Sequence, residues 1–93
     1  MPVVSEEEAP ERIAIIWSPA ARADVRAIER NAAMQILSCI DDYITKRTGG
    51  VKALRPPLTG FRLRCGNYRV FFDYTGPNAI EITKVKDRKK AYR

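Results

Sequence analysis

The stretch FRLRCGNYRVFF, residues 61–72, decides the fold of this chain. Apolar and polar residues alternate on either side of a central Gly66-Asn67 pair, and such alternation is typical of β-strands that bury one face. A Gly-Asn pair between two alternating runs is a strong signal for a two-residue hairpin turn. The stretch therefore predicts an antiparallel hairpin with strands over residues 61–65 and 68–74.

The pairing that this turn sets places three arginines on one face of the hairpin. Arg64 lies directly opposite Arg69, and Arg62 lies opposite Phe71 on the same face. Like charges that face each other across a sheet cost stability, so the cluster indicates a bound anion. Arginine at all three positions suits forked recognition of phosphate, and the ring of Phe71 offers a surface for a stacked base. The alternative is a solvated face whose arginines share Asp73.

The first half of the chain predicts one strand and two helices. Residues 12–17 are a β-branched and aromatic run, expected as a strand that is largely buried on both faces. Ser18 as N-cap and Pro19 at the first helical position begin a helix. A second helix follows a break near Asn31 and ends at the glycine pair 49–50. Its expected buried face comprises Ala33, Ile36, Leu37, Ile40, Tyr43 and Ile44.

The second half of the chain completes an α+β domain. Residues 51–60 are expected as a loop, because the diproline at 56–57 forbids regular structure there. A third strand is expected over residues 79–86 after a turn at 75–78, and a phase shift at 83–84 predicts a β-bulge. The expected architecture is an N-terminal strand and a two-helix hairpin packed on an antiparallel sheet, which a three-stranded C-terminal meander completes.

The charge of the chain is unevenly distributed around a formal net value of +6 at pH 7. Residues 1–11 contain four glutamates and no cation, whereas residues 12–93 carry all 17 lysines and arginines against seven acidic residues, a net charge of +10. We therefore expect a flexible acidic arm and then a single basic domain over residues 12–93. Solubility does not require so high a charge, which instead suits nucleic acid or an acidic protein partner.

Composition excludes several classes of protein. The longest apolar run, residues 13–17, is far shorter than the ~20 residues of a membrane span, and the amino terminus shows no signal-peptide pattern, so the chain is expected in the cytoplasm. There is no histidine, and Cys39 and Cys65 lack CxxC spacing. A metal site and a disulfide are therefore not expected, and the two cysteines are expected as small buried thiols.

The last ten residues, KVKDRKKAYR, gather cations around one tyrosine. Nearby positive charge lowers the pKa of an acid, so Tyr92 is expected to ionise more easily than a free tyrosine. Because the chain offers no carboxylate pair and no histidine, any catalysis would use guanidinium, ammonium and phenol groups. The alternative is a frayed basic tail. The cations are Lys84, Lys86, Arg88, Lys89, Lys90 and Arg93.

Over residues 13–92 the chain resembles toxins of the RelE/ParE superfamily from bacterial toxin–antitoxin pairs. The resemblance rests on the hairpin PLTGFRLRCGNYRVFF and on the closing VKDRKKAY. RelE-like members resemble small microbial ribonucleases and cut messenger RNA in the ribosomal A site without a metal or other cofactor. ParE-like members poison DNA gyrase and lack the nuclease residues. Arg88 followed by Tyr92 resembles the RelE branch, although many relatives have histidine where this chain has Asp87.

For a RelE-like activity, the resemblance implies cleavage by the 2′-hydroxyl of the RNA itself. Tyr92 would accept the proton of that hydroxyl, while Arg69 and Arg62 would hold the phosphate. Arg64 would support both groups, and Arg88 would lie at the leaving 5′-oxygen. The products would be a 2′,3′-cyclic phosphate and a free 5′-hydroxyl. The residues expected to contact RNA are Phe71, Lys84, Lys86, Lys89 and Lys90.

The resemblance also implies partners. A toxin of this kind has a cognate antitoxin, with an acidic or amphipathic segment that masks the basic site, and a RelE-like toxin acts on mRNA held by the ribosome. Two alternatives stay open from the sequence. One is a ParE-like gyrase poison without nuclease activity, and the other is a catalytically degenerate toxin fold that only binds an antitoxin or RNA.

Overall fold

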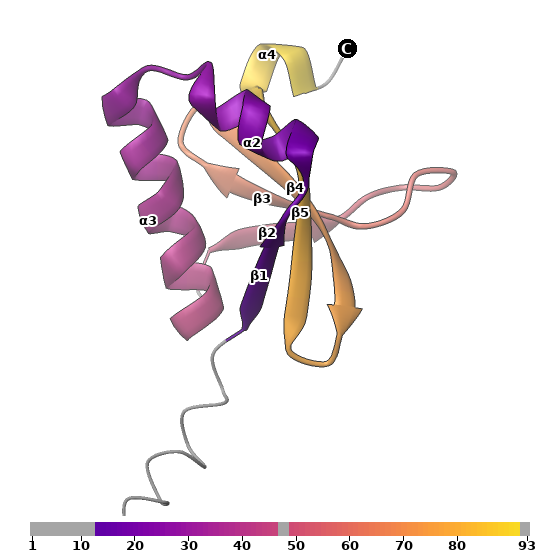
Figure 1. Ribbon diagram of the computed structural model, residues 1–93. Coiled ribbons are helices and arrows are strands. Elements are labelled where there is room, and N and C mark those ends of the chain that lie inside the picture. The colour runs from indigo at the N-terminus through magenta and orange to yellow at the C-terminus, as the bar shows by residue number, and fades with distance from the viewer. Residues whose placement is uncertain (1–12, 47–48, 92–93) are drawn as a thin grey trace, which may run out of the picture.

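A five-stranded sheet, covered on one face by two helices, forms the framework of the protein (Figure 1). The computed structural model describes residues 13–46 and 49–91. The strand order across the sheet is β1-β5-β4-β3-β2. In chain order the elements are β1 (Ala14–Trp17), α2 (Pro19–Arg26), α3 (Arg30–Lys46), β2 (Gly50–Ala53), β3 (Phe61–Cys65), β4 (Tyr68–Gly76), β5 (Ala79–Asp87) and α4 (Arg88–Ala91).

The expected α+β class is confirmed, but the sheet is mixed rather than antiparallel throughout. The first strand, β1, runs parallel to the last, β5, with Ala14 paired with Ala79 and Trp17 paired with Ile82. The other neighbouring strands pair antiparallel. Parallel neighbours require a long connection between them, which the two helices and the first strands of the meander provide.

The edge strand β1 is not buried on both faces, so this expectation is wrong. Ile15 and Trp17 are half-buried against the core, whereas Ile16 between them is 51% exposed. The helices cover only one face of the sheet, and alternation along the strand therefore exposes every second side chain. Ile13, immediately before the strand, is 2% exposed, and its amide donates a hydrogen bond of 3.1 Å to the carbonyl of Ile44.

Helix α2 begins as predicted from the sequence. The Ser18 Oγ accepts a hydrogen bond of 3.0 Å from the amide of Ala21, and Pro19 occupies the first turn. The same hydroxyl donates to the carbonyl of Thr83 on β5 at 3.1 Å, so the cap also fastens the helix to the sheet. In α3, Leu37 is 41% exposed although it was expected on the buried face. The buried residues of α3 are Ile36, Ile40, Tyr43 and Ile44.

The core lies between the sheet and these two helices. Tyr43 of α3 joins an aromatic cluster, in which its ring centre lies 5.6 Å from that of Phe72 and its hydroxyl lies 2.6 Å from the hydroxyl of Tyr74. The hydrogen bond satisfies the hydroxyl of the buried Tyr43, whereas Tyr74 is itself exposed. The largest fully buried side chains are Phe72, Ile13, Ile36, Leu63, Ile80, Ile82 and Val70.

Strand β2 lies in the segment expected as a loop, residues 51–60. It pairs antiparallel with β3, and Lys52 lies opposite Arg62. The diproline at 56–57 prevents regular structure only close to itself, so the residues before it can pair with the open edge of β3. The prediction of a loop is therefore wrong for residues 51–53.

The β3–β4 hairpin has the predicted register. Arg64 pairs with Arg69, and Cys65 pairs with Tyr68. Gly66 in the turn has a φ of +62°, the left-handed conformation that a tight hairpin turn requires and that glycine adopts without strain. The outer face of the hairpin therefore carries the arginines, as expected.

The predicted bulge lies at Thr83 of β5. Phe71 pairs with Lys84, whereas Phe72 pairs with Ile82, so Thr83 has no partner of its own across the β4–β5 pair. Its hydroxyl donates a hydrogen bond of 3.1 Å to the carbonyl of Phe71. The extra residue shifts the alternation of β5, and the Nζ of Lys84 lies 4.7 Å from the centre of the Phe71 ring.

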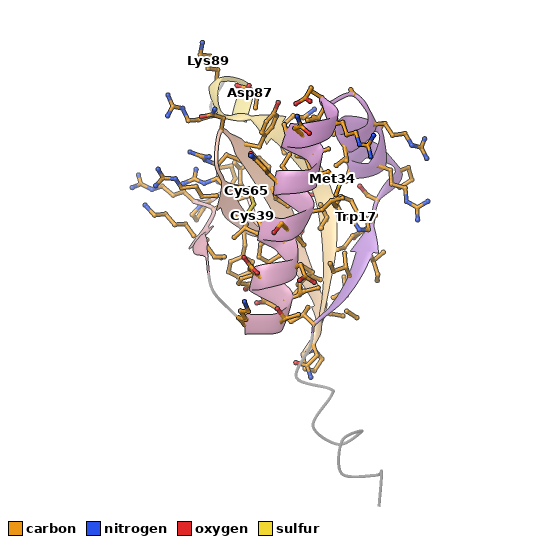
Figure 2. All side chains as sticks on the ribbon, turned by 90° about the vertical axis from the view of Figure 1, so that its left-hand side faces the viewer. Trp17, Met34, Cys39, Cys65, Asp87 and Lys89 are labelled. Atoms are coloured by element: carbon orange, nitrogen blue, oxygen red, sulfur yellow. A yellow bond between two sulfur atoms is a disulfide. The ribbon has the colours of Figure 1, made fainter. Side chains whose placement is uncertain are left out.

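A disulfide joins α3 to β3 (Figure 2). Its two residues, Cys39 and Cys65, were expected as free thiols, and that expectation is wrong. The sequence offers no close cysteine spacing, because 26 residues separate the two along the chain. They meet because Cys65 faces the helices at the end of β3 and Cys39 packs against the same core, which brings their Cα atoms to 5.8 Å.

The expectations about a membrane span, a metal site and the acidic arm can be compared only with the residues that the structure describes. Within residues 13–46 and 49–91, no helix is both long enough and apolar enough to cross a membrane. In the same ranges, no three histidine, cysteine or acidic side chains are grouped as a metal site. The acidic arm expected over residues 1–11 lies outside the described residues.

Candidate functional site

A cationic pocket lies on the face of the sheet opposite the helices. It has a volume of about 220 Å³ and is formed by strands β2, β3 and β4. Figure 2 shows long side chains that end in nitrogen gathered along this outer side of the sheet. Every charged residue in the lining is basic. The lining residues are Gly50, Val51, Lys52, Arg62, Arg64 and Arg69.

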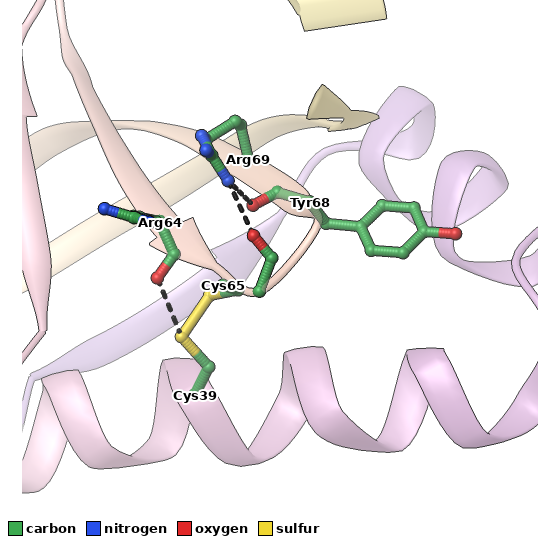
Figure 3. Close-up of a disulfide and its surroundings, with 6 residues drawn as sticks. Cys39, Arg64, Cys65, Tyr68 and Arg69 are labelled. Atoms are coloured by element: carbon green, nitrogen blue, oxygen red, sulfur yellow. Dashed lines mark hydrogen bonds between the residues drawn. A yellow bond between two sulfur atoms is a disulfide. The ribbon is translucent and has the colours of Figure 1, made fainter. Parts of the chain in front are cut away.

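Arg69 is the buried cation of the pocket, with 6% of its surface exposed. Its Nη1 donates hydrogen bonds to the carbonyl oxygens of Gly66 and Tyr68, each at 2.9 Å (Figure 3). A buried guanidinium is stable only where its N–H groups find acceptors, and the turn carbonyls supply two of them. The hairpin turn therefore holds Arg69 in a fixed orientation at the wall of the pocket.

The other cations of the pocket come from two strands. Arg64 is exposed and lies directly opposite Arg69 on β4. Arg62 is half-buried and lies between Lys52 on β2 and Phe71 on β4. Four positive charges around one hollow repel one another, and an anion placed among them relieves that repulsion. The pocket is therefore suited to a phosphate group, which guanidinium forks and an ammonium group bind well.

The short helix α4 begins at the hairpin turn. The amide of Arg88 donates a hydrogen bond of 2.7 Å to the carbonyl of Asn67 in the turn. The carboxylate of Asp87 accepts a hydrogen bond of 2.8 Å from the amide of Lys89, as an N-cap residue does. Asp87 thus has a structural role at the start of α4. Arg88 and Lys89 both have exposed side chains.

Three of the residues expected to contact RNA make contacts within the protein: Lys84, Lys86 and Phe71. The Nζ of Lys86 lies 3.2 Å from a carboxylate oxygen of Asp24 on α2, at the edge of β5 that β1 leaves open. Phe71 is 7% exposed, and Lys84 lies over its ring. The ring of Phe71 is therefore not open to a stacked base. The exposed group at this place is the ammonium of Lys84, which covers the ring.

The structure thus brings together only part of the predicted site. Tyr92 and the side chain of Lys90 lie outside the described residues. Arg88 is fastened through its backbone to the turn that also holds Arg69. The three predicted residues that meet in one pocket are Arg62, Arg64 and Arg69.

A comparison with protein-family models identifies the family. The model of the ParE toxin of the type II toxin–antitoxin system parDE matches residues 15–92. The chain belongs to this family. The resemblance to the RelE/ParE superfamily seen in the sequence is thereby confirmed.

Solved toxin structures share the fold of this ParE-family toxin. The toxin–antitoxin complex RelBE2 from Mycobacterium tuberculosis matches with a TM-score of 0.73 and 21% identity, over 83% of this chain and 99% of that chain. An archaeal RelE–RelB complex from Pyrococcus horikoshii matches with a TM-score of 0.65 and 18% identity, over 83% of this chain and 96% of that chain. The YoeB dimer from Staphylococcus aureus matches with a TM-score of 0.62 and 22% identity, over 81% of this chain and 95% of that chain. A comparison with curated protein sequences gives no match.

Lys52 is a pocket residue of this ParE-family toxin that the sequence did not reveal. It belongs to the four-residue strand β2, which is too short for a clear alternation and which precedes a diproline. One signal in the sequence could have indicated it. The arginines of β3 form a pocket only if a further strand lies beside the open edge of β3, and otherwise they lie on a flat surface. Pairing with Arg62 then places Lys52 on the same face.

Proposed function

We propose that this ParE-family toxin cleaves mRNA on the ribosome by the metal-independent chemistry of RelE-like toxins. The observation that carries the proposal is the cationic pocket, in which a buried and oriented Arg69 stands beside three further cations. A phosphodiester carries one negative charge, and the charge rises toward two as a nucleophile adds to phosphorus. Fixed cations bind the charge-rich transition state more tightly than the substrate, which is the requirement for catalysis.

The proposed reaction is an attack of the 2′-oxygen on the adjacent phosphorus. The 2′-hydroxyl loses its proton to the phenolate of Tyr92, and the new P–O bond closes a 2′,3′-cyclic phosphate. The bond to the 5′-oxygen breaks with its electron pair on that oxygen, which takes a proton from water to become the 5′-hydroxyl. Arg69 and Arg62 hold the phosphate oxygens, and Arg64 favours both the phenolate and the bound phosphate. Arg88 stabilises the leaving 5′-oxygen by its charge, since a guanidinium is a poor proton donor at neutral pH.

The ribosome enters the proposal as the agent that positions the substrate. The proposed groups are guanidinium, ammonium and phenol, none of which has an ordinary pKa near 7. Acid–base catalysis is therefore weak on free RNA, and the rate depends on holding the 2′-oxygen, phosphorus and 5′-oxygen in line. An mRNA held in the A site supplies that geometry.

An antitoxin is the second proposed partner. Two of the structural relatives are toxin–antitoxin complexes, and the strongly basic body of this chain suits an acidic partner segment. A suitable surface is the apolar groove of about 390 Å³ between β1, α2 and α3, which Trp17, Val25 and Leu37 line. Arg22 and Arg26, one helical turn apart in the same lining, favour an amphipathic segment that carries acidic residues.

A gyrase poison is the second candidate function, because the matching family model is that of ParE toxins. In that case the cationic pocket would contact protein or DNA, and no bond in RNA would be cut. The two candidates differ in their dependence on Arg88 and Tyr92. Substitution of either residue would abolish RNA cleavage but would leave inhibition of gyrase supercoiling unchanged.

The experiment that tests the proposal is a translating-ribosome assay with primer extension to map mRNA ends. Wild-type protein should cut within the A site, and Arg62→Ala and Tyr92→Phe should each reduce the rate by about 100-fold or more, as expected for loss of a transition-state contact or a general base. The matched control is Arg22→Ala, which removes an exposed arginine on the helix side. Intact mRNA together with inhibited gyrase would establish the second candidate instead.

A further inference from the structure

The Cys39–Cys65 disulfide adjoins the cationic pocket. Cys65 stands between Arg64, which lines the pocket, and Gly66, whose carbonyl accepts a hydrogen bond of 2.9 Å from Arg69. The bond ties this corner of the hairpin to α3 (Figure 3). One covalent bond therefore holds the backbone that positions two of the four pocket cations.

A second contact joins α3 to the same corner. The Sγ of Cys39 lies 3.4 Å from the carbonyl oxygen of Arg64. A disulfide sulfur carries no proton, so in the bonded form this approach is only a van der Waals contact. A free Cys39 thiol has a proton and can donate a weak hydrogen bond to that carbonyl. Reduction therefore replaces a covalent tie between α3 and β3 by a weak and reversible one.

We propose that Cys39 and Cys65 form a thiol–disulfide exchange site that controls the cationic pocket. In the disulfide form, residues 64–66 are held against α3, and Arg64 and Arg69 are presented to an anion in fixed positions. In the dithiol form this corner moves more freely, and the pocket binds a phosphate group less tightly, because binding must then order it. For its effect on RNA, this inference rests on the proposed function.

The exchange requires a dithiol as reductant. A thiolate of the dithiol attacks the Sγ of Cys39, the less buried of the two residues, and Cys65 leaves as a thiolate. The second thiol of the reductant then attacks its own sulfur in the mixed disulfide, closes a disulfide of its own and releases Cys39. Two electrons pass from the reductant to the protein, and both cysteines end as thiols. A small disulfide as oxidant reverses the sequence.

The consequence is a toxin whose strength follows the thiol balance around it. Disulfides in a reducing compartment are usually transient, and the ones that persist or form there act in catalysis or sensing. A dithiol-rich environment would keep the pocket loose, and an oxidising one would tighten it.

The first measurement is RNA binding by the two redox forms. The probe is a fluorescent single-stranded RNA decamer, titrated with protein oxidised by glutathione disulfide or reduced by dithiothreitol. Ordering one long side chain weakens binding by roughly two- to tenfold, so reduction should raise the Kd by at least that factor. The double variant C39S/C65S should bind like the reduced protein and should not respond to either reagent. Equal Kd values for the two forms of the wild type would contradict the proposal.

A second measurement needs no RNA activity. Alkylation with a maleimide should label both cysteines after reduction and neither after oxidation. Amide hydrogen exchange at residues 64–69 should quicken about tenfold on reduction, because the tether no longer limits local opening. Labelling of both cysteines in oxidised protein, or identical exchange in the two forms, would overturn the exchange site. Faster exchange without any mRNA cleavage on ribosomes would uphold it and would remove only the nuclease function.

Discussion

Arg69 and Arg64 face each other across the hairpin, yet they have opposite relations to the fold. Arg69 is buried and donates to two turn carbonyls, so it is part of the structure that forms the turn. Arg64 is exposed and directly opposite, where its charge opposes that of Arg69. At the scale of single residues, the site therefore combines one cation that stabilises the fold, Arg69, with one that does not, Arg64.

This contrast predicts different effects on stability. Arg69→Ala should lower the free energy of unfolding by about 1–3 kcal/mol, because two partly buried hydrogen bonds of the hairpin turn are lost. Arg64→Ala should change it by less than about 0.5 kcal/mol, and in the stabilising direction, because a cross-strand repulsion disappears. Urea unfolding followed by circular dichroism measures both. Equal destabilisation by the two substitutions would show that Arg69 has no special structural role.

Lys52 allows a prediction about RNA contacts. For single-stranded nucleic acid, each phosphate contact contributes about 0.7 to the slope of log Kd against log salt concentration. Lys52→Ala should therefore lower the magnitude of that slope for an RNA decamer by about 0.7, and Arg22→Ala should leave it unchanged. The slopes follow from titrations at several salt concentrations. An unchanged slope for Lys52→Ala would place the RNA away from β2.

At the scale of elements, α2 is joined to β5 where the sheet loses a strand. The partner β1 ends at Trp17, opposite Ile82, so the β5 residues beyond it have no strand on that side. The carboxylate of Asp24 takes the place of a strand, since it accepts a hydrogen bond of 2.9 Å from the amide of Val85 and another of 3.2 Å from Lys86. One side chain on a helix thereby completes the hydrogen bonding of a strand.

Substitutions at Asp24 should separate these two bonds. Asp24→Ala leaves a half-buried amide without its acceptor and should lower the free energy of unfolding by about 1–3 kcal/mol. Asp24→Asn keeps an acceptor for Val85 and loses mainly the partly exposed ion pair with Lys86, which is worth about 1 kcal/mol or less. Thermal unfolding should therefore rank Asp24→Ala as the less stable variant. The reverse order would make the ion pair the dominant bond.

The elements that could be predicted are those specified by neighbours in the chain. The hairpin register, the cap at Ser18 and the bulge at Thr83 follow from alternation and turn chemistry within a few residues. The short strand β2, the exposed edge of β1 and the disulfide depend on which distant segment lies alongside. The same division applies to the site: its arginines are local to the hairpin, whereas Lys52 reaches them only through tertiary pairing.

At the scale of the whole molecule, the two proposed binding surfaces lie apart. The cationic pocket is formed by β2, β3 and β4 on the outer face, whereas the apolar groove lies by β1 at the other edge of the sheet, on the helix side. An antitoxin segment in the groove therefore does not itself fill the pocket. Masking the pocket requires a second segment of the antitoxin or a bulky neighbour.

This separation predicts independent effects of substitutions. Leu37→Asp places a charge on the apolar wall of the groove and should weaken binding of the cognate antitoxin by about tenfold or more, as loss of an apolar contact and repulsion of an acidic partner combine. RNA binding should stay unchanged. Calorimetric titration with the antitoxin and the RNA decamer assay together test this. Loss of both activities would show that the two surfaces are one.

The parallel pairing of β1 with β5 has a consequence during synthesis. Ser18, just after β1, bonds to Thr83 on β5, 65 residues later. At about 5–20 residues per second, β1 waits roughly 3–13 s for the strand that completes it. During that interval the aromatic and branched residues of β1 have no partner strand, so their apolar side chains stay exposed. Exposed apolar side chains are what chaperones bind. This interval is the time in which a partner already present could bind the chain before its last strand completes the fold.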